Sequence, residues 1–157
     1  REAAQSATDA EMKRLDERWR QMAHAEASRA DLMVKNDAVK AIMKKVESEI
    51  HRFVGSSEFP AALDALLASL ATEIHGDVVL IGPEGHVDHN KSWLSSNGHS
   101  GVTVEGSADF WDGVAVQDPA QTYRISNTLT GRYGRVEQDA RRLCMINLFG
   151  DNAAEGV

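Results

Sequence analysis

The first 54 residues contain no glycine and no proline. They are rich in Ala, Glu, Arg, Lys, Met and Leu, which have the strongest helix propensities. Opposite charges such as Glu11 and Arg14 also lie three or four residues apart, where they face each other on a helix. The segment therefore predicts one uninterrupted helix. About 50 residues of helix span about 75 Å, so we expect this helix to extend beyond what a chain of 157 residues can bury.

The apolar residues of this helix fall into two groups. In the first group, successive apolar residues are three, four and three residues apart, and one more follows 11 residues later. We predict that this group contacts a helix of another chain through Met12, Leu15, Trp19, Met22 and Met33. An 11-residue repeat, which links Met12 to Ala23 and Val34, describes the pattern better than a heptad and predicts a right-handed supercoil. The second group, between Val39 and Val54, is expected to pack on the chain's own head.

The rest of the chain predicts a small α+β head. Gly55-Ser56-Ser57 ends the long helix, and Phe59-Pro60 begins a second one that continues to Ile74. The further elements are a strand at 77–82, a short helix at 83–94, an edge strand at 102–105, a hairpin of 114–117 with 122–125, and a helix at 129–149 capped by Asn127 and Thr128. This order predicts a small mixed sheet with flanking helices. We divide the chain into a long coiled-coil helix (1–55), an α/β head (56–150) and a flexible tail (151–157).

Charge and cysteine content limit the possible environments. Residues 1–55 hold 11 Lys/Arg and 10 Asp/Glu, so the remaining 6 basic and 14 acidic residues give residues 56–157 a net charge of −8. An acidic head argues against a nucleic-acid partner and against docking on an anionic membrane. A single cysteine, Cys144, allows no internal disulfide. No apolar run reaches the roughly 18 residues of a membrane span. We expect a cytoplasmic protein without membrane insertion.

The sequence contains only weak candidates for catalytic, cofactor-binding or metal-binding sites. His86, Asp88 and His89 could contribute to a metal site, but no third ligand follows at a recognised spacing. No phosphate-binding loop and no nucleophile elbow occurs, and Cys144 lies in an apolar stretch where a thiol is expected to be buried and inert. We therefore expect no catalytic, cofactor or metal site, and a chain that is not an enzyme. The arginines near the last helix are either a solvated face or a contact for an acidic partner: Arg124, Arg132, Arg135, Arg141 and Arg142.

Residues 112–150 resemble the E-type stalk subunit of V-type and A-type rotary ATPases. That family has a Gly-Gly-Val strand, a hairpin, an acidic-Asn-Thr/Ser-Leu step and a last helix that ends in Leu-Phe-Gly. The corresponding residues here are Asp112-Gly113-Val114, Ser126-Asn127-Thr128-Leu129 and Leu148-Phe149-Gly150, so that Asp112 replaces a glycine and Ser126 an acidic residue. The long helix and the strands at 77–82 and 102–105 match the family's order. The histidine-rich stretch 83–100 departs from it.

The resemblance implies a peripheral stalk on the cytoplasmic side of a membrane-bound complex. The E-type subunit pairs its long helix with a stalk subunit of the G or H type, as a heterodimer, and its head binds the non-catalytic B-type subunit of the catalytic hexamer. The implied anchors of the head lie in the Asn127 turn and the last helix: Asn127, Leu129, Arg132, Leu148 and Phe149. Two alternatives remain open. One is the related stator-like regulator of flagellar and type III secretion ATPases, and the other is a metal-dependent hydrolase that uses His86, Asp88 and His89.

Overall fold

A computed structural model describes residues 2–150 and contains the predicted long helix, α1 (Glu2–Val54). Its 53 residues correspond to about 80 Å of helix. The helix ends where the sequence predicts, because the backbone turns at Gly55 and Ser56 Oγ donates a 2.6 Å hydrogen bond to the Phe53 carbonyl. Opposite charges four residues apart form exposed ion pairs on its surface, with Asp16 to Arg20 at 2.8 Å.

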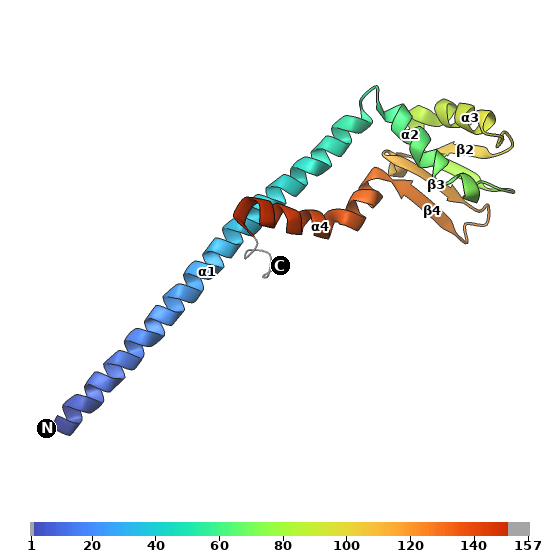
Figure 1. The fold of residues 1–157 in the computed structure, drawn as a ribbon. Helices are drawn as coiled ribbons and strands as arrows, with labels where there is room; N and C mark the ends of the chain where they lie inside the picture. The colour runs from blue at the N-terminus through green and yellow to red at the C-terminus, as the bar shows by residue number, and fades with distance from the viewer. Residues whose placement is uncertain (1, 151–157) are drawn as a thin grey trace. The chain divides into compact units, whose positions relative to one another are not determined.

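The head contains four strands and three further helices, which confirms the predicted α+β class (Figure 1). The helices are α2 (Phe59–Ala68), α3 (Val87–Ser96) and α4 (Leu129–Phe149), and the strands are β1 (Val79–Gly82), β2 (Thr103–Gly106), β3 (Gly113–Gln117) and β4 (Arg124–Thr128). Short 3-10 helices occur at Ala71–Glu73, Glu84–His86 and Ala108–Phe110.

The strands form one mixed sheet in the order β2-β1-β3-β4. β1 and β2 are parallel and are connected through α3, whereas β3 pairs antiparallel with both β1 and β4. The predicted edge position of the second strand and the predicted hairpin of the last two are therefore confirmed. β3 is buried along its whole length, as expected of a strand with neighbours on both sides.

The main core lies between one face of the sheet and the helices α2 and α3, which cover the same face (Figure 1). Because successive side chains of a strand point to opposite faces of the sheet, Leu80, Val114 and Val116 all lie on this face. Helix α2 buries Phe59, Leu63 and Leu67 against them, and α3 adds Leu94. The end of α1 also contributes, since Phe53 and Val54 pack against the cluster as the sequence predicts.

The opposite face of the sheet carries a smaller apolar cluster. Ile81 and Ala115 are buried there with Phe110, and Val79 packs against them. The Arg124 guanidinium lies over the Phe110 ring at 5.5 Å from its centroid. This position places a cation on the negative face of an aromatic ring, a favourable arrangement.

Several predicted boundaries differ from the structure. The sequence predicts a second helix as far as Ile74, but α2 ends at Ala68 and a separate 3-10 turn follows. Ser69 there donates its hydroxyl to the Leu66 carbonyl at 2.8 Å, a local bond that competes with continuation of the helix. The sequence also predicts that the last strand ends at Ile125, but β4 runs to Thr128 because Gly113 and Val114 of β3 extend the ladder.

The start of α4 differs from prediction at one residue. Thr128 acts as the expected cap, since its Oγ1 accepts a 2.9 Å hydrogen bond from the Gly131 amide. The prediction that Asn127 caps this helix is wrong, because its side chain faces α2 instead. Asp112 is 1% exposed and accepts from the Thr130 amide at 2.6 Å through Oδ2. A carboxylate at this position also complements the helix dipole.

The chain divides into two compact units. Among the described residues, one comprises 2–42 together with 144–150, and the other comprises Met43–Leu143. Both α1 and α4 therefore contribute residues to each unit. The predicted flexible tail, 151–157, lies outside the described residues.

Candidate protein–protein interface

The predicted partner-binding residues are all exposed on α1. Every residue from Asp9 to Asp31 is exposed, including large apolar side chains such as Trp19 at 67% and Leu15 at 48%. We call the apolar stripe the set of exposed apolar side chains that share this side of the helix: Met12, Leu15, Trp19, Met22, Ala23, Ala30, Met33 and Val34. Apolar residues scattered singly on a surface are ordinary, but a contiguous row of large ones marks an interaction surface.

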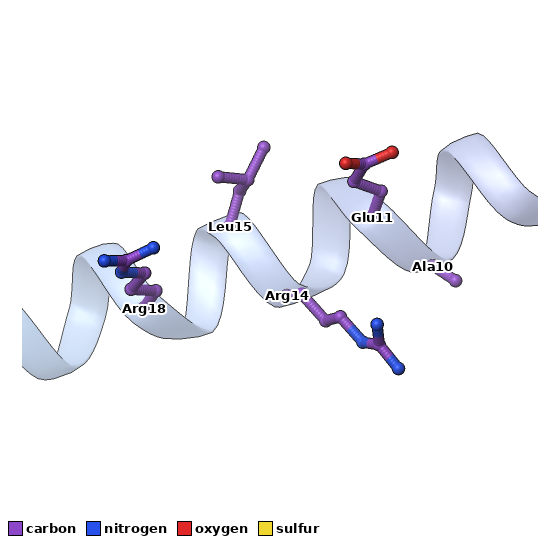
Figure 2. A pocket seen from close by; sticks show the side chains of 5 residues that line it. All are labelled: Ala10, Glu11, Arg14, Leu15 and Arg18. Carbon is purple, nitrogen blue, oxygen red and sulfur yellow. The ribbon is translucent and has the colours of Figure 1, made fainter.

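Figure 2 shows the first part of this surface at close range. Glu11, Leu15 and Arg18 project from one side of the helix, whereas Arg14 points away from them. These three residues are spaced by four and three, the spacing of neighbours on one helix face. The described residues that line the groove around them all belong to α1 and are exposed, so it is an open surface and not an enclosed ligand site.

The chain's own packing in this unit uses a different side of α1. Leu32 is half-buried and Val39, seven residues further on, is buried. Between them, the Lys35 ammonium lies 5.7 Å from the centroid of the Phe149 ring at the end of α4. Met33 and Val34 next to these positions remain exposed. The end of α4 therefore leaves the apolar stripe uncovered.

The candidate anchor residues of the head fall into two groups. Asn127 is 7% exposed, so its side chain serves the head's own structure. It donates to the Leu66 carbonyl at 3.1 Å and to Ser69 Oγ, and its Oδ1 accepts a 2.8 Å bond from Arg132 Nε. Leu129 packs partly buried against the main core.

Leu148 and Phe149, the remaining anchor candidates, are exposed at the end of α4. They belong to the other compact unit. The residues among the five that stay accessible to a partner are Arg132, Leu148 and Phe149.

Only some of the five arginines near the last helix form hydrogen bonds or ion pairs with other residues of the head. Arg124 donates to Gln117 Oε1 at 2.6 Å, and Arg141 pairs with Glu137 at 2.6 Å. Arg135 and Arg142 are exposed and take part in none of the ion pairs in the described part of the chain.

The two histidines that suggested a metal site, His86 and His89, lie near each other with ring centroids 6.3 Å apart, but each also contacts another side chain. His89 Nε2 lies 2.7 Å from Asp64 Oδ1, and the His86 ring packs edge-on against Phe59. His99 stacks on Trp93. Within residues 2–150, no three His, Cys, Asp or Glu side chains are grouped so that they could hold a metal ion. Cys144 is half-buried, not buried as predicted.

None of the helices in the described segment is both long enough and apolar enough to cross a bilayer. Comparison of the sequence with models of protein families and with curated protein sequences finds no match.

Proposed function

We propose that this chain is the E-type subunit of the peripheral stalk of a V-type or A-type rotary ATPase. In this role it is not an enzyme and holds no cofactor. Its long helix pairs with a second long-helix subunit of the G or H type, and its head binds the non-catalytic B-type subunit of the catalytic hexamer. The stalk lies on the cytoplasmic side of the membrane-bound complex and resists torque, so that rotation stays coupled to ATP chemistry.

The observation that carries the proposal is the uncovered apolar stripe on α1. Burying a side chain of the size of Leu or Met yields about 1.5–3 kcal/mol. Several such side chains remain in water along one side of α1, while the chain's own α4 packs on another side. A helix pair is the geometry in which a narrow stripe of this length becomes buried. The 11-residue spacing of Met12, Ala23 and Val34 favours a right-handed pair.

The order of the head's elements also supports the proposal. Gly113-Val114 begins β3, and the hairpin with β4 leads through Asn127 directly into α4, which ends before Gly150. These are the residues on which the resemblance rests. An added Cβ at Gly113 would lie 2.4 Å from the Asn127 carbonyl oxygen, so the close crossing of β3 and β4 requires glycine there.

Sedimentation and circular dichroism test the proposal directly. The chain is measured alone and after mixing with the long-helix stalk subunit encoded in the same operon. We expect a 1:1 complex with a gain in helicity and in thermal stability. A chain that remains a stable monomer or homodimer, indifferent to that subunit, would contradict the proposal and favour the secretion-ATPase regulator.

Replacing Trp19 tests the surface itself. Trp19→Ala removes the largest side chain of the apolar stripe, so it should weaken the heterodimer by at least about tenfold, as expected for a buried aromatic anchor. The melting temperature of the head should not change. Gln21→Ala is the matched control, because Gln21 is exposed on α1 but lies two residues further on, on another side of the helix. Affinity is measured by titration calorimetry, and equal effects of the two variants would contradict the predicted interface.

A further inference from the structure

Helix α3 ends in a capped turn at Asn97-Gly98, the only Asn-Gly step in the sequence. Gly98 has a φ of +84°, in the left-handed region that favours glycine. The Gly98 amide donates to the Ser95 carbonyl at 3.5 Å, and the His99 amide donates to the Leu94 carbonyl at 2.8 Å. These two bonds form a Schellman motif, which satisfies the last carbonyls of a helix. The cap therefore depends on the main-chain spacing between Asn97 and His99.

The side chains of this turn also contact the end of α3. Asn97 Nδ2 donates to the Trp93 carbonyl at 2.8 Å, and the His99 ring stacks on the Trp93 ring with centroids 6.5 Å apart. Asn97 is nevertheless exposed. A Cβ built on Gly98 would meet no described atom within 4 Å beyond its two chain neighbours. The turn is thus open to water at both residues.

We infer that Asn97 is a site of spontaneous deamidation in the folded chain. The main-chain nitrogen of Gly98 loses its proton to water or hydroxide and attacks the side-chain carbonyl carbon of Asn97. A new C–N bond closes a succinimide ring, and the side-chain nitrogen takes up a proton and leaves as ammonia. Water then opens the ring at one of its two carbonyls and gives either aspartate or isoaspartate. Glycine allows this attack because it has no Cβ to hinder the main-chain rotation that ring closure requires.

The two products weaken the cap of α3 in different ways. Aspartate keeps the main chain, but it replaces the donor to the Trp93 carbonyl with a carboxylate, which only accepts. Its charge also lies at the negative end of the helix dipole. Isoaspartate adds a methylene group to the main chain before Gly98, so the Gly98 and His99 amides are displaced from the carbonyls to which they donate. Deamidation therefore loosens the end of α3 and the segment that leads to β2.

Peptide mapping by mass spectrometry of the full chain, aged at neutral pH, tests the site. We expect conversion at Asn97 to be at least about tenfold faster than at Asn147, which is exposed but lies inside α4 and precedes Leu148. Conversion should be faster at mildly alkaline pH, because the attacking nitrogen must lose its proton. Asn97→Gln is the matched variant, since glutamine would have to close a larger ring, and it should acquire no isoaspartate at this position. Equal rates at Asn97 and Asn147 would overturn the inference.

Hydrogen exchange measures the effect of the modification on the cap, after chromatography separates the products from the unmodified chain. The amides of Gly98 and His99 should exchange at least about fivefold faster in the isoaspartate form. Asn97→Asp reproduces the other product and should increase their exchange about twofold to fivefold. The central strand β3 should not change in either protein, because it is buried along its length. Unchanged exchange at His99 in the isoaspartate form would overturn the predicted loss of the cap.

Discussion

Asn127 connects three elements of the head through one side chain. It lies on β4 opposite Val114, on the face of the sheet that α2 covers. From there its amide donates to the Leu66 carbonyl of α2 and to Ser69, which directly follows α2, and its oxygen accepts from Arg132 of α4. A buried amide with all these partners stabilises a specific arrangement of strand and helices, because any other arrangement leaves it unsatisfied.

Replacing Asn127 should therefore destabilise the head. Asn127→Ala leaves the Leu66 carbonyl and the Arg132 guanidinium with one partner fewer, so we expect a loss of about 1–3 kcal/mol in the free energy of unfolding. Urea denaturation followed by near-UV circular dichroism measures this loss. Ser126→Ala, at the exposed neighbouring position of β4, should change stability by no more than about 0.5 kcal/mol. A loss no larger than this control would show that the Asn127 bonds contribute little.

Asp112 shows the limit of residue-level prediction. The sequence Asp112-Gly113 is typical of a turn, and a turn carboxylate is usually solvated. In the folded chain the hairpin returns the start of α4 to this turn, and Asp112 accepts from the Thr130 amide. No local pattern connects residues 18 positions apart, so only the pairing of β3 with β4 determines this contact.

At the scale of elements, the β3–β4 hairpin carries a pH-sensitive turn. The Thr122 hydroxyl and then the Tyr123 amide donate to the Asp118 carboxylate, at 2.6 and 2.9 Å, and lower the pKa of Asp118 below its ordinary value of 3.8. The folded state therefore favours the charged carboxylate. This stabilisation is present above the ordinary pKa and is lost as the pH falls through the lowered one.

A carboxyl-carbon NMR titration tests this turn. We expect Asp118 in the folded chain to titrate below 3.8. Thr122→Val removes the hydroxyl that has the largest effect, so the pKa of Asp118 should rise towards its ordinary value in that variant. Identical titration curves for the two proteins would contradict the assigned cause.

At the scale of the whole molecule, the two parts of α1 differ in what stabilises them. Residues 9–31 are exposed throughout, whereas Phe53 and Val54 pack against the main core. A helix without tertiary packing depends on propensity and on short-range ion pairs, which together give only marginal stability. The free part of α1 is thus suited to gain its stability from a partner.

Hydrogen exchange measures this difference. In the chain alone, amides of residues 9–31 should exchange at least about tenfold faster than those of the central strand β3. Adding the long-helix stalk subunit should slow exchange in residues 9–31 and leave Val114–Val116 unchanged, because β3 is already buried. Equal protection of both regions in the chain alone would mean that α1 needs no partner for its stability.

Local chemistry determined most of the elements of this protein. An unbroken run of helix formers without Gly or Pro specifies α1, and apolar runs between turn residues specify β1 and β3, because both signals act over a few neighbouring residues. The side of α1 on which the exposed apolar residues lie also follows from spacing alone.

Only the tertiary structure decided where the polar side chains and the last turns of α4 go. The sequence predicts that Asn127 caps a helix, but its side chain donates a hydrogen bond to the carbonyl of Leu66, 61 residues away. Asp112 becomes buried, and Phe149 meets Lys35 of α1. Such contacts depend on which distant surfaces meet when the apolar faces are buried, and sequence periodicity does not encode that choice.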